Sequence, residues 1–350
     1  MPKTLRAALL WLLLFSILLG CVACSPSKAD RDDPDPGQNA SDGDTCTVLF
    51  VVDGEVYDAK SVPAGEAVSR PASQPHKEYY FFLDWYTSED GGTPYDFSSP
   101  VQSDRLYLYA RFQVDASRLT HEITTEHMSA IVTVTVTQYK PIKFLGMDLG
   151  KDKSTSKSGS GSGVVFEITD SYVLVLTNCH VAYNEKGYTY YEVTVTDYKG
   201  NTYDAVQYHS VSKPEKAISA DYDLAVLYID EDRDEHSFSA LKPAGENAER
   251  GDVAISVGAP DGQKNAIDFG EVKGYKTVTL DNTPTEESNV CFDVLNHSAY
   301  VLPGSSGGAI LNADLELIGI HYAAERGNPY NGYAIPASKV REFLKRYVYN

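Results

Sequence analysis

The sequence predicts an all-β protein in which a small sheet is followed by a longer region of β-barrels. Tyr is abundant at 25 residues while Met is limited to 3, and aromatic side chains suit the pleated surface of a sheet. Short runs alternate between apolar and polar residues, with hairpin turns such as 199–201 between them. A helical pattern occurs only near the end, at 337–347. A chain of 350 residues has room for two domains, three at most.

Composition and charge narrow the possible functions. Hydrophobic residues make up 42% of the chain and charged residues 23%, which is typical of globular proteins and excludes a fibrous or wholly disordered chain. The formal net charge is −19. A field of that sign repels phosphate backbones and argues against a nucleic-acid partner.

Residues 1–24 are typical of a bacterial export signal. Lys3 and Arg6 precede an apolar run at 7–20 that is too short to span a bilayer comfortably. The run ends in LLGC, which resembles the lipobox of bacterial lipoproteins, where the Cys is lipid-modified and becomes the new N-terminus. Cys21 is the first candidate for that lipid and Cys24 the second, while an ordinary secretory signal is the alternative. We therefore expect a protein anchored by lipid to the bacterial membrane or cell surface, or otherwise secreted.

Residues 25–44 predict an acidic, disordered tether. The segment is rich in Asp, Pro and Gly and has almost nothing apolar to bury. Beyond it, three cysteines are left, Cys46, Cys179 and Cys291, which have no metal-binding spacing and allow at most one disulfide.

Residues 45–114 predict a small sheet. Val48, Phe50 and Val52 alternate before a turn, and residues 106–110 alternate again. With its Trp85-Tyr86 pair, the segment resembles one copy of the Listeria–Bacteroides repeat, a β-grasp module of bacterial surface proteins. We expect Trp85 to lie in the core of this module. The binding partner of the module is unknown.

From residue 122 to 350 the chain continues as a longer series of strands. The runs at 131–137, 164–168, 172–176 and 191–196 are β-branched or apolar, and no helices alternate with them. This pattern favours β-barrels over an α/β sheet. The Lys-rich and Ser/Gly-rich segment at 150–163 is predicted to be a mobile loop.

A glycine-flanked serine is the first candidate for chemistry. Ser306 lies in the motif GSSGG at 304–308, between apolar segments at 299–302 and 309–311. Glycines allow a sharp turn that would expose the Ser306 hydroxyl and direct the amides of Gly304 and Ser306 toward one point. Such paired donors form an oxyanion hole, although the motif alone could be a simple turn.

A histidine and an aspartate complete the candidate site. His180 follows the apolar run at 172–177, and Asp223 opens another run at 224–227 that is expected to be buried. A buried carboxylate without a partner is costly. Pairing with the Nδ1 proton of His180 would remove that cost and leave Nε2 free to accept a proton from a hydroxyl group.

The order His180, Asp223, Ser306, with spacings of 43 and 83 residues, resembles the chymotrypsin-like serine proteases, and most closely the bacterial HtrA/DegP type. Further matches at 161–165, 251–260, 319–320 and 332–336 extend the resemblance over more than half of the chain. The resemblance implies a chymotrypsin-like double β-barrel over 122–350. It also implies a serine endopeptidase for protein or peptide substrates that needs no metal or organic cofactor. HtrA proteins usually continue into a PDZ domain, for which this sequence has no counterpart.

The same resemblance suggests which residues select the substrate. Tyr300 matches the base of the specificity pocket, and Tyr322, Ala323 and Gly332 match its opposite wall. None is acidic, so we expect cleavage after small or medium apolar residues rather than after Arg or Lys, unless Glu325 turns into the site. Ser305 stands where an activation-dependent protease has an acid, so no cleaved propeptide should be needed.

Two other functions are considered: a metal site, which the spacing of the residues disfavours, and an adhesion or binding role, which stays open. The pairs at 121–122 and 126–127 lack the H-E-x-x-H spacing of a metal site and are interpreted as a polar joint between domains. His297 and His321 are expected to be structural. The chain could also be an adhesion or binding protein that uses the protease fold as a catalytically weak or inactive scaffold.

Overall fold

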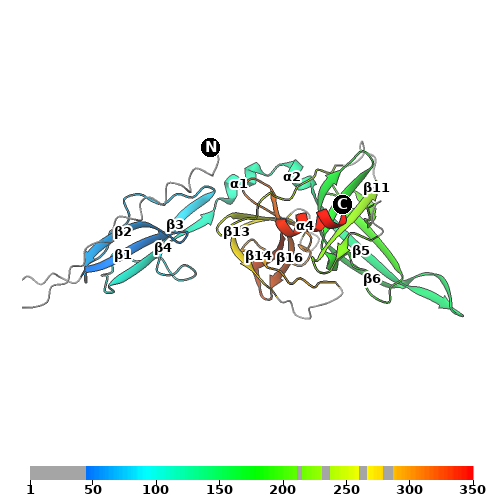
Figure 1. Ribbon diagram of the computed structural model, residues 1–350, viewed down its shortest axis with the longest axis horizontal. Helices are drawn as coiled ribbons and strands as arrows, with labels where there is room; N and C mark the ends of the chain where they lie inside the picture. The colour runs from blue at the N-terminus through cyan, green and yellow to red at the C-terminus, as the bar shows by residue number, and fades with distance from the viewer. Residues whose placement is uncertain (1–44, 211–214, 231–236, 260–265, 279–286, 350) are drawn as a thin grey trace, which may run out of the picture. The chain divides into compact units, whose positions relative to one another are not determined.

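The computed structural model describes residues 45–210, 215–230, 237–259, 266–278 and 287–349. The expected export signal, with Cys21 and Cys24, and the tether lie outside the described residues. Residues 45–350 form one compact unit that contains every strand and hydrophobic cluster of the described chain. The elements are mostly strands, which confirms the all-β prediction (Figure 1). None of the described helices has the length and apolar character needed to cross a membrane.

The first sheet has four strands in the order β2-β1-β4-β3. They are β1 (Thr45–Val52), β2 (Glu55–Pro63), β3 (Tyr80–Tyr86) and β4 (Arg105–Val114), and β1 and β4 run parallel. Alternation along β1 places Cys46, Val48 and Phe50 on the buried face. Trp85 is also buried and packs edge-on against Phe50, so its expected core role is confirmed.

The first barrel follows two short helices, α1 (Ala116–Glu122) and α2 (Thr125–Ser129). Its strands are β5 (Ile131–Phe144), β6 (Met147–Ile168), β7 (Tyr172–Thr177), β8 (Tyr190–Thr196), β9 (Thr202–Gln207), β10 (Ile218–Ser219) and β11 (Leu224–Asp230). They are hydrogen-bonded in the order β10-β11-β7-β6-β5-β8-β9. Because β11 also pairs with β9, the sheet closes on itself.

The second barrel is closed, in the order β12-β13-β14-β17-β16-β15. Its strands are β12 (Val253–Gly258), β13 (Ala266–Lys276), β14 (Val294–His297), β15 (Ala309–Leu311), β16 (Leu317–Glu325) and β17 (Asn328–Pro336). The chain then forms α4 (Ala337–Tyr347), at the predicted helical pattern. The buried face of α4 carries Phe343, which packs against Tyr222, the residue that precedes Asp223.

Two predictions about local structure were wrong. The segment 150–163 is part of strand β6 rather than a mobile loop, because backbone pairing with β5 fixes it from Val164 to Ser158 and again near the tip. Glycine suits this pairing, since a Cβ on Gly163 would lie 2.7 Å from a methyl group of Val175. The short helices α1, α2 and α3 (Cys179–Ala182) were not predicted, because helices of 4 to 7 residues are too short to show a helical periodicity. No disulfide forms among Cys46, Cys179 and Cys291, all of which are free.

Candidate active site

Neighbouring strand ends bring His180 and Asp223 together. Strand β7 pairs antiparallel with β11, and the pair Thr177 and Ala225 stands at the end of that ladder. The chain leaves β7 into the short helix α3, which carries His180, while Asp223 immediately precedes β11. The predicted partners, 43 residues apart in sequence, therefore meet at one end of the first barrel.

Asp223 is fully buried and makes two hydrogen bonds with His180. The backbone N–H of His180 donates to Oδ1 at 3.0 Å, and Nδ1 of the ring lies 2.8 Å from Oδ2. The side-chain amide of Asn178 also donates to the carbonyl oxygen of Asp223 at 2.9 Å. Asp223 has a φ of +47°, a left-handed conformation that non-glycine residues seldom adopt outside turns and functional sites. The carboxylate is thus held on both oxygens.

The pKa of His180 is raised above its usual value. Burial acts to lower it, but the charge and the hydrogen bond of Asp223 outweigh burial, and the charge of Glu287 adds to their effect. The side chain of His180 is 30% exposed while that of Asp223 is 0% exposed. The Asp223 carboxylate is therefore buried, while part of the His180 ring is accessible to solvent, as a general base requires.

The Ser306 loop turns sharply between the second-barrel strands. Gly304 has a φ of +93° and Gly307 of +86°. Three amides of the loop donate to backbone carbonyls: those of Ser305 and Gly308 bond within the loop, to Leu302 and Ser305, and that of Gly307 bonds to His321 on β16. Among the described residues, the amides of Gly304 and Ser306 donate to no backbone carbonyl. These two amides are the pair predicted to bind an oxyanion.

Ser162 of the first barrel holds this loop, a role that the sequence analysis missed. Its backbone N–H donates to the carbonyl of Ser306 at 2.7 Å, and its hydroxyl donates to the carbonyl of Gly304 at 2.7 Å. The same hydroxyl accepts the amide of Ala259 at 2.8 Å. Ser162 is fully buried, so these bonds are shielded from water. The sequence signal that could have indicated the burial of Ser162 is the apolar pair that follows the Gly-Ser-Gly triplet at 161–163.

Gly161 brings the base segment close to the nucleophile segment. A Cβ on Gly161 would lie 2.8 Å from a methyl group of Val181, the neighbour of His180, and 3.0 Å from the carbonyl oxygen of Ser306. A side chain at position 161 would push the two segments apart, which explains why glycine occupies this position. The three predicted triad residues come from separate elements: His180 from α3, Asp223 from the residue before β11 and Ser306 from the loop before β15. The structure joins His180 and Asp223 directly, and Gly161 lies between the segments of His180 and Ser306.

The predicted specificity residues lie on β16, β17 and the preceding loop. Ala323 and Gly332 stand on adjacent paired strands. Tyr300 is partly exposed and its ring packs against Tyr330 at 4.9 Å. Tyr322 differs, because its ring is buried and its hydroxyl lies 3.4 Å from that of Ser288. Its ring is therefore part of the hydrophobic core rather than of an open surface.

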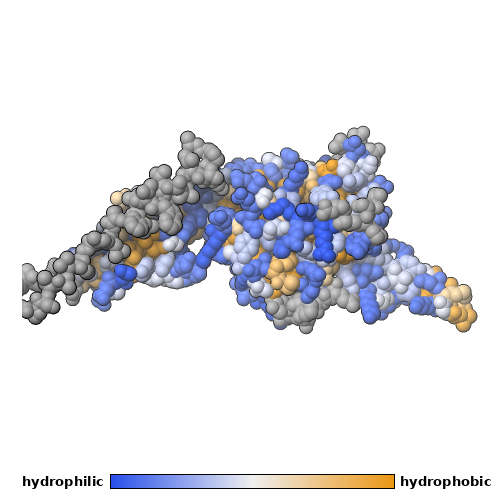
Figure 2. Space-filling view, in the orientation of Figure 1, coloured by the Kyte–Doolittle hydropathy of each residue, from blue (hydrophilic) through white to orange (hydrophobic). Residues whose placement is uncertain are grey.

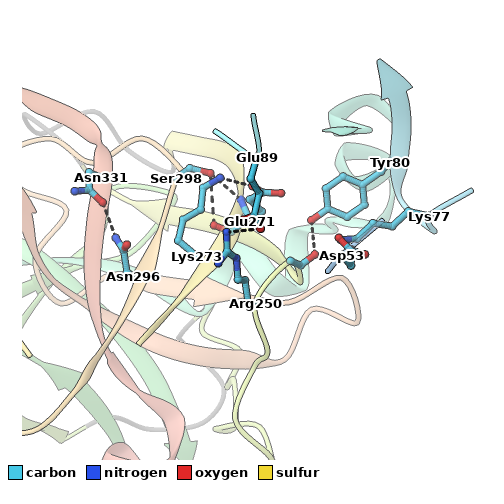
Figure 3. A network of polar contacts seen from close by, with 11 residues as sticks. Asp53, Lys77, Tyr80, Glu89, Arg250, Glu271, Lys273, Asn296, Ser298 and Asn331 are labelled. Atoms are coloured by element: carbon cyan, nitrogen blue, oxygen red, sulfur yellow. Dashed lines mark hydrogen bonds and ion pairs between the residues drawn. The ribbon is translucent and has the colours of Figure 1, made fainter. Parts of the chain in front are cut away.

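Polar side chains fix the strand that carries Gly332 (Figure 3). The Asn296 amide donates to Oδ1 of Asn331 at 2.6 Å and to the carbonyl of Gly332 at 3.0 Å. The Asn331 amide in turn donates to Glu325 at 2.7 Å. Glu325 is therefore engaged at an exposed turn. A Cβ on Gly332 would lie 2.4 Å from the His297 ring, so only glycine fits there.

His297 on β14 and His321 on β16 are fully buried next to each other. Their ring centroids are 5.3 Å apart. Burial lowers the pKa of His297 to about 4, and burial together with His297 lowers that of His321 well below its usual value. Both rings are therefore neutral at pH 7. Nε2 of His321 bonds the Ser256 hydroxyl at 2.8 Å, which suits the expected structural role.

His121 and His127, near the start of the first barrel, make hydrogen bonds within their own short helices. Nδ1 of His121 lies 2.6 Å from the Ser117 carbonyl, and His127 caps α2 through Thr124. Within the described ranges, no three His, Cys, Asp or Glu side chains gather in a way that could hold a metal ion.

We predict that Ser162→Ala destabilises the protein, because it leaves the Ala259 amide and the Gly304 carbonyl buried without a partner. The expected loss in the free energy of unfolding is about 1–3 kcal/mol, measured by urea denaturation. Ser160→Ala is the matched control, since Ser160 is exposed on the same strand. Equal stability of the two variants would show that the Ser162 hydroxyl does not support the loop.

Comparison with known proteins finds two domain families that match parts of the chain. Residues 161–320 match the trypsin-like peptidase domain, and residues 47–111 match the Listeria–Bacteroides repeat domain. The serine protease Do-like HtrA of Bacillus subtilis is 28% identical over 235 residues, which cover 65% of this chain and 48% of that protein. The periplasmic serine endoprotease DegP of Escherichia coli is 31% identical over 192 residues, which cover 54% of this chain and 35% of that protein.

The chain therefore spans about half the length, or less, of these curated relatives. The crystal structure of the Rv3671c protease from M. tuberculosis in its active form has the same fold, with a TM-score of 0.50 at 19% identity, covering 67% of this chain and 87% of that one. Two of the predicted resemblances are confirmed: the chain carries a trypsin-like peptidase domain homologous to those of HtrA and DegP, preceded by a Listeria–Bacteroides repeat domain.

Proposed function

We propose that the chain is a serine endopeptidase that hydrolyses peptide bonds through His180, Asp223 and Ser306. The observation that carries the proposal is the pair of hydrogen bonds that His180 makes with a fully buried Asp223 carboxylate. Burying a carboxylate is costly, and a ring merely packed for stability would not need that partner. Homology to HtrA and DegP proteases supports the same reaction class.

The geometry suggests the following sequence of steps. The Asp223 carboxylate accepts a hydrogen bond from the Nδ1–H group of His180, so the proton stays on Nδ1 and Nε2 is the basic nitrogen. Nε2 takes the proton of the Ser306 hydroxyl as its oxygen attacks the scissile carbonyl, and then gives it to the leaving amine. The amides of Gly304 and Ser306 stabilise the negative oxygen of the tetrahedral intermediate. Water then releases the acyl group by the same route.

Ser305 is a poor candidate for the nucleophile. It is buried, and its hydroxyl oxygen accepts the amide of Leu302 at 3.3 Å. Ser306 is partly exposed. We further propose that Ser162, through its bonds to Gly304 and Ser306, keeps the loop in its active shape, so that no newly cleaved N-terminus is needed.

Substrate choice should exclude basic side chains. The acid next to Tyr300 is Asp268, whose carboxylate is engaged by the Tyr300 amide at 2.6 Å. Tyr300, Ala323 and Gly332, with the backbone of Tyr322, would form an uncharged pocket. A cation entering it would lose its hydration without gaining a partner.

We place the enzyme outside the cytoplasm, attached through a lipid on Cys21 or, alternatively, Cys24. The lipobox resemblance supports the anchor. The relative DegP is named as a periplasmic protease, which supports a location outside the cytoplasm. The domains we assign are the signal at 1–24, the tether at 25–44, the β-grasp repeat at 45–114 and the protease at 122–350. An adhesion protein with an inactive scaffold would share all of these features except a reactive Ser306.

The nucleophile can be tested by covalent labelling. A fluorophosphonate probe should label the wild-type chain and fail to label Ser306→Ala, because an activated hydroxyl attacks phosphorus as it does a carbonyl. His180→Ala should lower turnover by about 10⁴-fold or more with little change in folding. Absence of labelling in the folded wild-type chain would favour the inactive scaffold. Labelling of Ser306→Ala but not of Ser305→Ala would overturn the assignment.

The pH dependence tests the base. Because the pKa of His180 is raised, kcat/KM should increase with pH through an inflection above the usual histidine value near 6.5. Glu287→Gln removes one charge that raises this pKa, so the inflection should fall by less than about one pH unit. Glu192→Gln is the control, since Glu192 pairs with Lys151. An unchanged inflection in Glu287→Gln would contradict the electrostatic account.

The specificity can be read from cleavage of a mixed peptide library analysed by mass spectrometry. Cuts should follow small or medium apolar residues. Dominant cleavage after Arg or Lys would refute the uncharged pocket. It would indicate Glu325, or Asp268, whose carboxylate accepts the Tyr300 amide at 2.6 Å, as the missed determinant.

A further inference from the structure

The hairpin of β5 and β6 extends beyond the rest of the first barrel. Strand β5 pairs with β8 only as far as Tyr139, opposite Tyr190. From residue 140 the two strands continue as a ribbon that pairs only with itself among the described residues, and Figure 1 shows it projecting from the barrel. We call residues 140–153 the hairpin tip. A two-stranded ribbon is marginally stable in water, so this extension needs an explanation.

The hairpin tip gathers exposed apolar side chains. Its large apolar residues that are exposed are Ile142, Phe144, Leu145, Met147 and Leu149. Figure 2 shows them as a hydrophobic end on an otherwise hydrophilic region. Singly exposed apolar residues are ordinary, but a contiguous group at the end of a projection marks an interaction site.

Leu145 breaks two rules of local structure at once. It is 85% exposed, and it has a φ of +49° in the two-residue turn with Gly146, whose φ is +81°. Turns of this kind favour Asn, Asp or Gly, because other side chains are strained at positive φ. An Asn would fit both the turn and the solvent. A Leu at this position is therefore unfavourable for the free fold, which points to a function for its side chain.

Lysines surround the apolar end. The hairpin tip holds Lys140, Lys143, Lys151 and Lys153 against Asp148 and Asp152, in a chain with a net charge of −19. Lys151 pairs with Glu192, whereas Lys143 and Lys153 form no ion pair with any described residue. The acidic side chains are partly engaged, since Asp148 accepts the Tyr190 hydroxyl at 2.8 Å. An apolar apex with a basic collar complements an anionic lipid surface.

We propose that the hairpin tip inserts into the headgroup region of an anionic phospholipid bilayer. At about 3.3 Å per residue, the distance from Ile142 to the turn is roughly 10 Å, which matches the depth to which interfacial segments enter. The apolar apex would lie at the boundary of the acyl chains, and Lys143 and Lys153 would meet the phosphates. Two tips packed against each other would instead bring lysines together. The contact is independent of residues 1–44 and of the proposed catalysis.

Co-sedimentation with vesicles tests the proposal, using residues 45–350, which form the compact unit. This chain should bind vesicles of equal parts phosphatidylglycerol and phosphatidylcholine and should bind pure phosphatidylcholine much less. Leu145→Asn should weaken binding about tenfold, and Phe144→Ser with Met147→Ser about a hundredfold, because each removes apolar area from the contact. Phe81→Ser is the control, because Phe81 is exposed on β3 outside the hairpin tip.

Thermal stability separates a membrane role from a structural one. Leu145→Asn should raise the melting temperature while it weakens vesicle binding, since Asn tolerates the positive φ. In Phe144→Trp, the emission of the new indole should shift to shorter wavelength on anionic vesicles, against the buried Trp85 as background. Absence of vesicle binding, or equal binding by Leu145→Asn, would overturn the proposal. So would a wild-type dimer that Leu145→Asn converts to a monomer in light scattering, because the occupant would then be a second copy.

Discussion

The candidate site depends on the burial of one carboxylate. Asp223 is excluded from solvent at the first residue before β11, in a left-handed conformation that costs additional energy. Both costs are offset by the two hydrogen bonds to His180 and by the bond from Asn178. Because a buried charge without partners would be strongly destabilising, the position of His180 follows from that of Asp223. The packing of α4 on Tyr222 extends this constraint to the C-terminal helix.

A second dependence joins the two barrels. The loop that carries Ser306 belongs to the second barrel, yet its carbonyl groups at 304 and 306 are held by Ser162 on β6. Thr177 completes the contact by donating to the carbonyl of Ser162 at 2.7 Å, and Thr177 is also the last residue of β7 before the His180 segment. The shape of the nucleophile loop and the position of the base therefore share one set of buried hydrogen bonds.

The sequence predicted most of the fold because its strands alternate in the period that a half-buried sheet requires. The buried run from Leu224 and the apolar run before His180 both proved to be strands, and the glycines around Ser306 proved to lie in a turn with positive φ. Ser162 could not be assigned in the same way. Its run of Ser and Gly has the composition of a linker, and its buried partners, Gly304 and Ala259, lie far away in sequence.

The hairpin tip and Tyr322 show a similar limit. The exposure of Leu145 follows from the absence of a third strand beside the ribbon, which depends on where β8 begins and not on local pattern. Tyr322 is buried in a hydrophobic cluster that draws residues from both barrels, and its hydroxyl lies near that of Ser288, so its burial depends on residues far away in sequence. Short helices such as α3 are set by the strand ends that they connect, so they leave no periodic signal.

The central claim is that buried Asp223 holds the Nδ1 proton of His180 and leaves Nε2 as the base. Proton NMR of the chain with ¹⁵N-labelled histidine tests it most directly. We predict an imidazole proton on Nδ1 of His180, shifted downfield and slow to exchange with water, that disappears in Asp223→Asn. A neutral His180 that carries its proton on Nε2 in the wild-type chain would contradict the account.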